Sequence, residues 1–354
     1  MTHLTLGHDF FFQFGGAERV TSTLANETFA GSAVIALGGD QRIMRELQLE
    51  RTKIIGSAGL NANNYRTRSL AAPVKLHREL IEGNLISSSY AFIHHLRATG
   101  LHLVYCHSPL RQIWSGRGDY ARGRLANRLA LRGVSGPLRK IDRAAARRAD
   151  AYVATNKVVA SRVTEFYGVI PYAIVPPPID DRFFSEPIER GETYVWAGRI
   201  VEPYKRLGLV IEAFRNTKRQ LVVVGDGRDR ARLESAAPPN VTFVGRKKTS
   251  ELASIFAGSK ALIFPSEDDF GMVPIEAMAS GTPVIAWDGG GPAETVREGV
   301  GIRFREPTTT ALHAALTAFE SQDWDPREIH AYAKKFSTSE FSGRMRDVWA
   351  SLDR

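Results

Sequence analysis

The chain of 354 residues contains a single cysteine, Cys106, and lacks any long hydrophobic run. One cysteine excludes an internal disulfide framework and a cysteine-based metal cluster, and it fits a reducing compartment. The longest apolar runs are strand-sized, such as Leu221–Val224, whereas a membrane-spanning helix needs roughly 20 apolar residues. The N-terminus also lacks the basic start and apolar region of a signal peptide. We therefore expect a cytoplasmic protein.

Positive charge is in excess, with 47 Lys and Arg against 38 Asp and Glu, a formal net charge of +9. The excess is concentrated between Arg111 and Arg148, where the only acids are Asp119 and Asp142. Such a surface attracts phosphates of an anionic membrane, a pyrophosphate-linked acceptor or a nucleic acid. A solvated helix face without a partner is the alternative. The stretch lacks a nucleic-acid-binding motif and the interleaved aromatic residues of single-strand binders, which argues against nucleic acid.

Short, continuous apolar segments alternate with helical patterns along most of the chain. Continuous runs of four to six residues are typical of strands that are buried on both faces of a parallel sheet. The alternation predicts an α/β fold with doubly wound sheets. The expected strands are Ala33–Leu37, Leu101–Cys106, Ala151–Thr155, Tyr172–Val175, Tyr194–Ala197, Leu221–Val224, Val241–Val244, Ala261–Phe264 and Pro283–Ala286.

A break in the pattern falls at three consecutive prolines, residues 176–178. Three prolines cannot continue a helix or a central strand, and they hold the backbone extended. We interpret them as a linker between a domain at residues 1–178 and a second domain at residues 179–324. The last segment, residues 325–354, has an amphipathic helical pattern, and we expect it to pack back onto the first domain.

The segment from Phe264 to Ala286 carries the strongest local motif, which reads as strand, loop, helix, turn and strand. Carboxylates in its loop precede Gly271, a residue type that allows close approach of the backbone to a ligand. The amides at the start of the helix form an anion site, which the helix dipole strengthens. Glu276 is suited to accept hydrogen bonds from ribose hydroxyls. Its alternative interpretation is an ordinary acid near a helix N-terminus.

Asp268 and Glu276 are separated by seven residues, with Phe270 and Gly271 between them. This spacing resembles the E-x-F-G-x-x-x-x-E signature of the retaining glycosyltransferases of family 4. The resemblance implies a GT-B fold, in which two Rossmann-like domains face each other across a cleft. It also implies that Asp268 contacts the donor sugar, that Glu276 contacts the ribose, and that the backbone around Phe270, Gly271, Met272 and Val273 binds the donor.

This chain departs from the family pattern at the first acid, where Asp268 stands in place of glutamate. Because Asp268 is one methylene shorter, either the loop lies closer to the donor or Glu267 takes over the position. The assignment of the second acid, Glu276, is unaffected.

Two cations upstream, Arg199 and Lys205, match the G-R…K pair of the same family. The resemblance implies that they hold the donor pyrophosphate. Charge develops on the leaving phosphate during sugar transfer, and Arg and Lys stabilise it. We expect no metal and no cofactor beyond the nucleotide-sugar substrate, a GDP- or UDP-sugar. The only Asp-x-Asp, at Asp323 and Asp325, does not lie between strands and is not interpreted as a metal site. A pair of surface charges is the alternative for the cations.

In the first domain, Gly15, Gly16 and Glu18 resemble the Gly-Gly-Ala-Glu of the family. Consecutive glycines allow backbone amides to approach a phosphate or the acceptor, and a plain tight turn is the alternative. Gly15 and Gly16 are assigned to the donor and Glu18 to the acceptor. His107 follows a strand, and the resemblance places it near the donor sugar. A histidine packed at a strand end is its alternative.

Trp114 and Tyr120 follow His107 in the sequence and are candidates for the acceptor site, because aromatic rings stack on sugars. The run Phe10–Phe12 is either a lipid-facing loop or a buried strand end. The remaining histidines of this domain lack a comparable context and are expected to be structural or at the surface: His3, His8, His94, His95 and His102.

These observations predict a retaining transfer of a sugar, with GDP-mannose favoured as donor, to a glycan or lipid-linked acceptor in surface-polysaccharide assembly. The resemblance implies that the leaving phosphate helps to take the acceptor proton, so no covalent nucleophile is required. Peripheral contact with the inner face of an anionic membrane agrees with the basic first domain. Two other hypotheses remain: a GT-B-fold nucleotide-sugar epimerase and, from another class, a basic nucleic-acid-binding protein. Product analysis without acceptor distinguishes the epimerase.

Overall fold

The computed structural model describes residues 3–114, 125–184, 186 and 189–353, and it divides the chain into two compact units. The first unit comprises Met1–Pro178 together with Phe341–Arg354, and the second unit comprises Ile179–Glu340. The chain therefore passes from the first unit into the second at the prolines and returns for its last residues. Residues 325–340 stay with the second unit, which corrects the expectation that the whole segment 325–354 packs on the first.

The first unit is built on a seven-stranded sheet in which every pair of neighbouring strands is parallel. Its order is β3-β2-β1-β5-β7-β8-β9. Two short strands, β4 (Leu80–Ile81) and β6 (Arg97–Ala98), pair separately. The strands of the main sheet are β1 (Leu4–Phe11), β2 (Ala33–Gly39), β3 (Lys53–Ile54), β5 (Asn84–Ser89), β7 (His102–Cys106), β8 (Ala151–Ala154) and β9 (Ala173–Ile174).

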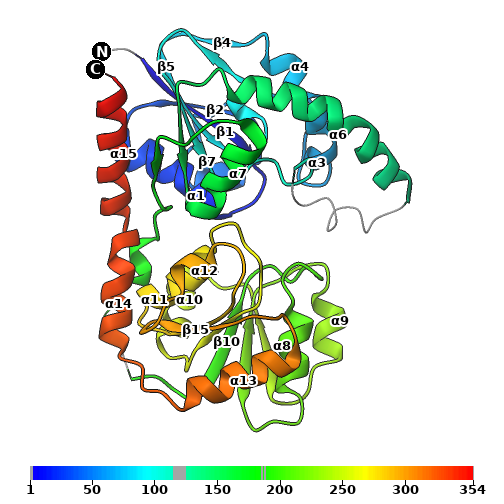
Figure 1. Ribbon diagram of the computed structural model, residues 1–354, viewed down its shortest axis with the longest axis vertical. Coiled ribbons are helices and arrows are strands. Elements are labelled where there is room, and N and C mark those ends of the chain that lie inside the picture. The colour runs from blue at the N-terminus through cyan, green and yellow to red at the C-terminus, as the bar shows by residue number, and fades with distance from the viewer. Residues whose placement is uncertain (1–2, 115–124, 185, 187–188, 354) are drawn as a thin grey trace. The chain divides into compact units, whose positions relative to one another are not determined.

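Helices cover both faces of this sheet (Figure 1). One face packs against α6 (Leu125–Ala146) and α7 (Lys157–Tyr167), and the other packs against α1 (Gly16–Thr23) and α15 (Thr338–Leu352). Successive side chains of a strand point into the cores on opposite faces of the sheet, as expected for a pleated strand. The remaining helical segments are η1 (Leu24–Thr28), α2 (Gln41–Glu46), α3 (Tyr65–Arg68), η2 (Ser69–Ala71), α4 (Ala72–Leu76) and η3 (Ile93–His95).

The second unit has a six-stranded parallel sheet of order β12-β11-β10-β13-β14-β15. From β10 the strands follow in sequence as β11 and β12 on one side and as β13, β14 and β15 on the other. The direction in which strands are added therefore changes between β10 and β13. This is the strand order of a dinucleotide-binding fold. The strands are β10 (Thr193–Ala197), β11 (Gln220–Val224), β12 (Val241–Gly245), β13 (Leu262–Phe264), β14 (Val284–Trp287) and β15 (Gly301–Phe304).

Two cores again flank this sheet. Tyr194 and Trp196 of β10 face α8 (Leu207–Phe214) and α13 (Thr309–Glu320), while Val195 and Ala197 face α10, α11 and α14. The other helical segments are η4 (Asp181–Phe183), α9 (Arg230–Ser235), α10 (Thr249–Ala257), α11 (Met272–Ala279), α12 (Pro292–Thr295), α14 (Pro326–Ala333) and η5 (Lys334–Phe336).

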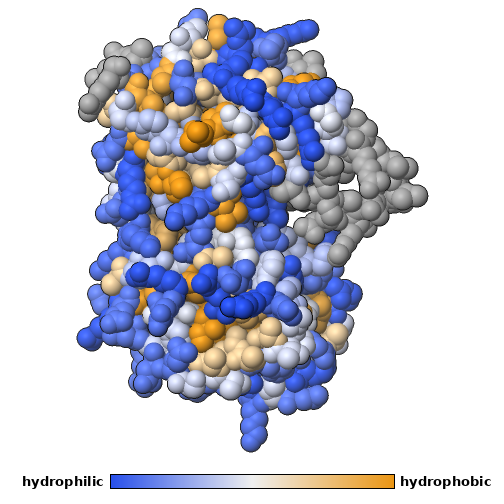
Figure 2. Space-filling model, viewed as in Figure 1, coloured by the Kyte–Doolittle hydropathy of each residue, from blue (hydrophilic) through white to orange (hydrophobic). Residues whose placement is uncertain are grey.

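The expected α/β architecture with two parallel sheets is confirmed. Phe10 and Phe11 are buried at 2% and 0% exposure, so the run that begins at Phe10 is a buried strand end and not a lipid-facing loop. Among the described residues, no helix combines the length and apolarity that a membrane crossing requires. The face shown in Figure 2 is largely hydrophilic, with hydrophobic residues interspersed.

Candidate functional site

The second unit brings two of the predicted donor residues, Lys205 and Asp268, together at the point where its strand order reverses. In open α/β sheets, ligands bind outside the carboxyl ends of the strands at such a point. The chain leaves the carboxyl end of β10 toward Arg199 and Lys205, and it leaves β13 toward Asp268. Two segments that are more than 60 residues apart in sequence thus supply cations and a carboxylate to one edge of the sheet.

Asp268 and Lys205 form a mostly buried ion pair at this edge. The Lys205 ammonium lies 2.8 Å from Oδ1 and 2.7 Å from Oδ2 of Asp268, and the exposed fractions of the two side chains are 11% and 20%. The Tyr204 hydroxyl donates a second hydrogen bond to Oδ1 at 2.9 Å. The ammonium also lies over the Phe264 ring, 5.6 Å from its centroid. Both oxygens of Asp268 therefore have partners, and the lysine is held in one position.

Arg206, the residue after Lys205, adopts a left-handed backbone conformation with φ of 50°. A non-glycine residue rarely occupies this region, and its occurrence often marks a functional constraint. Two contacts hold it: its Nη1 donates to the carbonyl of Pro265 at 2.8 Å, and its guanidinium lies 4.2 Å from the Trp287 ring centroid. The contact to Pro265 joins the Lys205 segment to the start of the loop that carries Asp268. Arg199 itself is exposed.

A turn at Gly290 and Gly291, the glycine turn, packs against the backbone of the loop that carries Asp268. The amide of Gly291 donates to the carbonyl of Asp268 at 2.8 Å. A Cβ added at Gly290 would lie 2.4 Å from that same carbonyl oxygen, and one at Gly291 would lie 2.1 Å from the carbonyl oxygen of Phe270. Backbone therefore packs on backbone here, which only glycine permits.

Helix α11 begins directly after this loop, with Gly271 as its N-cap at φ of 82°. Glu276 lies on the helix and is 2% exposed. Met272 and Val273 are half-buried in the first turn. The Phe270 ring packs in the core against Phe336, so this residue offers a donor its backbone rather than its ring. The loop and helix together present the amide-rich N-terminus that the sequence predicts for an anion.

The first unit has the same reversal of strand order, here between β1 and β5. Gly15 is the N-cap of α1, and Gly16 is its first residue. Glu18 is 1% exposed, and a Cβ on Gly15 would lie 2.5 Å from its Oε2. Glu18 is thus packed against the glycine turn, and the missing side chain at Gly15 makes room for its carboxylate.

His107 follows β7 at the same edge of the first sheet and is half-buried. Its Nε2 lies 2.8 Å from the hydroxyl of Ser88 on β5. Burial lowers the pKa of His107 to about 3, and repulsion from His8 acts in the same direction. The ring is therefore neutral at physiological pH. His107 sits where parallel-sheet proteins bind ligands, as the sequence predicts.

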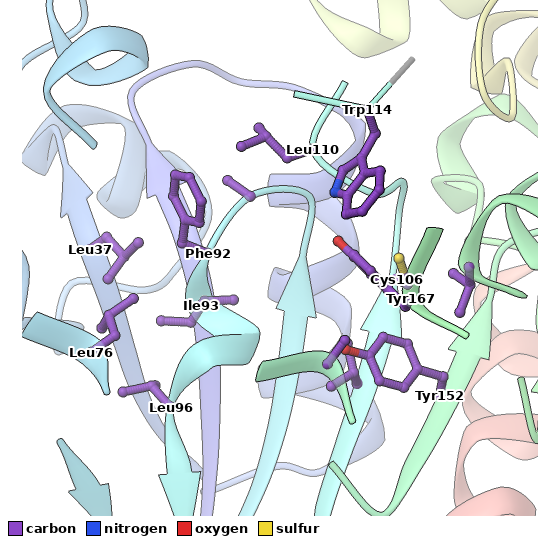
Figure 3. Packing of buried hydrophobic residues seen from close by; sticks show 14 of the residues in the cluster. Leu37, Leu76, Phe92, Ile93, Leu96, Cys106, Leu110, Trp114, Tyr152 and Tyr167 are labelled. Atoms are coloured by element: carbon purple, nitrogen blue, oxygen red, sulfur yellow. The ribbon is translucent and has the colours of Figure 1, made fainter. Parts of the chain in front are cut away.

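Trp114 does not lie where an acceptor sugar can stack on it. The residue is 9% exposed; its ring stacks on Phe166 with centroids 5.0 Å apart, and the Arg139 guanidinium lies 5.0 Å from the ring centroid. Its indole N–H donates to Oδ2 of buried Asp142 at 2.7 Å. Figure 3 shows the ring among Leu110, Cys106 and Tyr167. The assignment of Trp114 to the acceptor is therefore corrected to a core role. The other aromatic candidate, Tyr120, lies outside the described residues.

Asp142 also binds a histidine pair that the sequence left without a role. His95 Nε2 lies 2.8 Å and His94 Nε2 lies 3.2 Å from its Oδ1. Burial lowers the pKa of His95 to about 4, against the opposing effect of its hydrogen bond with Asp142. Burial raises the pKa of Asp142, but the hydrogen bonds from both histidines outweigh this effect and lower it. A neutral histidine donating to an ionised aspartate accounts for the His95 contact.

The described part of the basic segment is only partly a solvated surface. Four arginines on and after α6 donate to backbone carbonyls of the first unit. These bonds tie the helix to η3, to α7 and to Ile113, the residue before Trp114. The arginines are Arg139, Arg143, Arg147 and Arg148.

The fold and the site together define a class of protein, the GT-B fold, in which two parallel doubly wound units follow each other in one chain. The structure of Anabaena HepE in complex with UDP and glucose aligns with a TM-score of 0.71 at 15% identity, covering 98% of this chain and 99% of that one. Sucrose-phosphate synthase from Thermosynechococcus elongatus aligns with a TM-score of 0.70 at 18% identity, covering 99% of each chain. Residues 179–336 match the model of the family described as Glycosyl transferases group 1.

Curated relatives resemble this chain over parts of their length. A GDP-mannose-dependent alpha-mannosyltransferase of Mycobacterium tuberculosis is 47% identical over 78 residues, which cover 22% of this chain and 20% of the relative. A D-inositol 3-phosphate glycosyltransferase of Gordonia bronchialis is 31% identical over 53% of this chain and 49% of the relative. The alpha-1,3/1,6-mannosyltransferase ALG2 of Eremothecium gossypii is 24% identical over 73% and 60%. The aligned stretches thus span less than two thirds of each relative.

Proposed function

We propose that the protein transfers a sugar from a nucleoside diphosphate sugar to a hydroxyl of an acceptor, and that the second unit binds the donor. The observation that carries this proposal is the placement of Arg199, Lys205 and the N-terminus of α11 at one edge of a dinucleotide-type sheet. Two cations and a row of helix amides form a site for a diphosphate. The match of residues 179–336 to the model of Glycosyl transferases group 1 supports the same conclusion.

The chemistry follows from the charges at this edge. When the bond between the sugar C1 and the diphosphate oxygen breaks, negative charge grows on that oxygen, and Lys205 and Arg199 stabilise it. The acceptor oxygen then bonds to C1 on the same face, and its proton passes to the departing phosphate oxygen. Buried Glu276 binds the ribose hydroxyls. Asp268 orients Lys205 through their ion pair. We assign the contact with the donor sugar to the same aspartate.

GDP-mannose is the donor that we propose. Support comes from the two mannosyltransferases that use GDP-mannose and that are 47% and 45% identical to this chain over 78 residues. For the acceptor we propose a glycan on a lipid diphosphate, as in surface-polysaccharide assembly, because basic residues are concentrated between Arg111 and Arg148 of the first unit. Peripheral contact with an anionic membrane would bring such an acceptor within reach.

The test is a thermal-shift screen with GDP, UDP, ADP and dTDP, followed by an assay of the matching nucleotide sugars. A ligand at about a hundred times its Kd stabilises by about 2.7 kcal/mol. We expect GDP to raise the Tm of the wild type but not of Arg199→Ala or Glu276→Gln. Exposed Arg305 supplies the matched control, Arg305→Ala, which should respond like the wild type.

Incubation of the enzyme with GDP-mannose, with and without a lipid-diphosphate glycan, then separates the functions. Transfer that requires acceptor and retains the anomeric configuration supports the proposal. Release or isomerisation of the sugar without acceptor would indicate an epimerase or hydrolase. If no nucleotide raises the Tm, the donor site is wrongly assigned.

A further inference from the structure

Arg206 occupies a backbone conformation that glycine adopts without penalty. Its φ is 50°, and it is the N-cap of α8, where its side chain makes no capping hydrogen bond. For a residue with a Cβ atom, this left-handed conformation costs free energy, which other contacts must offset. The cap itself does not require an arginine, so the contacts of the guanidinium account for the residue.

The two contacts of the guanidinium lie at the carboxyl ends of β13 and β14. Arg206 Nη1 donates to the carbonyl of Pro265, the residue after β13 is followed, at 2.8 Å, and the guanidinium carbon lies 4.2 Å from the ring centroid of Trp287, the last residue of β14. The ring is fixed in turn, because its Nε1 donates to the carbonyl of Arg305 at 3.0 Å. A planar guanidinium serves both contacts, with its face on the ring and an N–H at its edge for the carbonyl, whereas an ammonium has no such face.

The Trp287 ring also lies against the segment that leads into the glycine turn. A Cβ added at Gly289 would lie 2.7 Å from Cζ3 of the ring, closer than carbon atoms approach without a shift. Gly291, two residues further on, donates to the carbonyl of Asp268 at 2.8 Å. The tryptophan therefore connects Arg206 to the turn that supports the Asp268 loop.

These contacts form a continuous path that begins and ends at Lys205. The path runs through Arg206, Trp287, the glycine turn and Asp268. The ion pair with Asp268 holds the Lys205 ammonium, and Arg206 holds the backbone from which the lysine side chain extends. The position of the ammonium relative to the Asp268 loop is therefore set at both ends of the lysine.

We propose that Arg206 is a positioning residue, which through its contact with Trp287 holds the Lys205 ammonium where it meets the diphosphate of the donor. The role toward the diphosphate rests on the proposed function. The position of the ammonium rests only on residues of the second unit. A diphosphate then meets a cation that is ordered before it binds, so the cost of ordering a lysine side chain does not weaken the complex.

The first test compares the affinities for GDP and guanosine by titration calorimetry. Arg206→Gly removes both contacts and leaves the left-handed conformation unstrained, so we expect it to fold. Its Kd for GDP should rise about tenfold, roughly the loss of one charge-assisted hydrogen bond. Its Kd for guanosine, which lacks the phosphates, should stay unchanged. A general loosening of the unit would weaken both ligands alike.

Two further variants separate positioning from a direct effect of the Arg206 charge. Trp287→Leu keeps the arginine but removes the ring, and it should weaken GDP binding by a similar factor. The double variant of Arg206→Gly and Trp287→Leu should bind GDP no more weakly than either single variant, because both changes break the same path. Arg206→Lys, which keeps the charge without the planar group, should behave like Arg206→Gly.

A measurement without ligand follows Lys205 itself. Its amine is 9% exposed and paired with Asp268, so it should react slowly with acetic anhydride, as measured by mass spectrometry of its peptide. In Arg206→Gly we expect its labelling to be several-fold faster. The exposed Lys218 is the control, and its labelling should be the same in both proteins.

Wild-type GDP affinity in Arg206→Gly or in Trp287→Leu would overturn the proposal, as would an equal loss of guanosine affinity. Additive effects in the double variant, or wild-type affinity in Arg206→Lys, would show that the arginine acts through its charge and would also overturn it. An unchanged labelling rate of Lys205 would contradict it without any ligand. If the labelling changes as expected but the wild type binds no nucleoside diphosphate, the proposed function fails while the positioning of Lys205 holds.

Discussion

At the scale of single residues, the ion pair of Lys205 and Asp268 sets the state of the site before a donor arrives. Each charge is largely removed from water, and each neutralises the other. A diphosphate that approaches Lys205 must therefore share the ammonium with Asp268. Asp268 thus keeps Lys205 in position but weakens the attraction of the lysine for phosphate.

Asp268→Asn should consequently lower the stability of the second unit while raising its affinity for a diphosphate. Without its counter-charge the mostly buried lysine destabilises the second unit, by about 1–3 kcal/mol, and a bound diphosphate replaces the missing negative charge. We expect a lower Tm for the ligand-free variant but a larger Tm increase with GDP than in the wild type, together with a loss of transfer. The neighbouring Asp269→Asn is the control. An equal or smaller GDP shift in Asp268→Asn would contradict this account.

Sequence reasoning located the residues of this site that belong to a local pattern, and it missed those that complete it from a distance. Asp268 and Glu276 share one motif of nine residues. Tyr204 is recognised only once the fold brings it to Asp268, 64 positions further on. Trp114 was misplaced for a related reason: its partners, buried Asp142 and half-buried Phe166, lie on two later helices.

At the scale of elements, continuous apolar runs identified most strands but not all. Strand β5 (Asn84–Ser89) ends in three serines, and β15 (Gly301–Phe304) contains an arginine, so neither reads as apolar. The serines of β5 are nevertheless buried, because hydrogen bonds satisfy them inside the unit. Polar strands of this kind are invisible to a hydrophobic pattern and become evident only with their partners.

The glycine turn behind the Asp268 loop gives a prediction at this scale. Gly291→Ala should displace the loop, because the new methyl group would overlap the carbonyl of Phe270. We expect GDP to stabilise this variant much less than the wild type. Gly343→Ala lies inside helix α15, where a methyl group meets no neighbour within 4 Å, and it should raise stability by about 0.5–1 kcal/mol. Calorimetry of both variants with and without GDP tests the contrast.

Helix α15 gives a second prediction, since it supplies buried residues to the first unit although it is last in sequence. Met345 is completely buried among residues of that core. Met345→Ala should lower the unfolding free energy by about 2–5 kcal/mol through lost contacts and a cavity. Exposed Arg346 is the matched neighbour, and Arg346→Ala should change it by less than about 0.5 kcal/mol. Urea titration of both variants is the measurement, and similar midpoints would refute the role assigned to Met345.

At the scale of the whole molecule, buried histidines make the two units differ in their response to acid. Burial lowers the pKa of His8, His102 and His107 to about 3 and that of His95 to about 4. All four lie in the first unit. Their folded-state pKa values lie below the unfolded value, so the unfolded chain binds more protons, and stability falls as the pH drops from about 6.5 toward 4. Asp9, whose pKa burial raises, opposes this trend as one group against four.

We therefore expect the first unit to unfold before the second on acidification, with a loss of about 1–2 kcal/mol per histidine at pH 5. Hydrogen exchange followed by mass spectrometry between pH 8 and pH 4.5 resolves the two units. His102→Gln should reduce the proton uptake on unfolding by about one. Earlier loss of protection in the second unit would contradict this prediction.

The return of the chain to its first unit after residue 340 also has a consequence for synthesis. Strands β1 to β9 leave the ribosome early, but Phe341 and Met345, which close one of their two cores, are translated last. At about 5–20 residues per second, the nascent first unit waits roughly ten to thirty seconds, with one apolar sheet face covered by α1 but not yet by α15, while Ile179–Glu340 is made. During that interval we expect the exposed apolar residues to favour binding by chaperones, and termination just after residue 340 would release a protein whose finished second unit is attached to an incomplete first one.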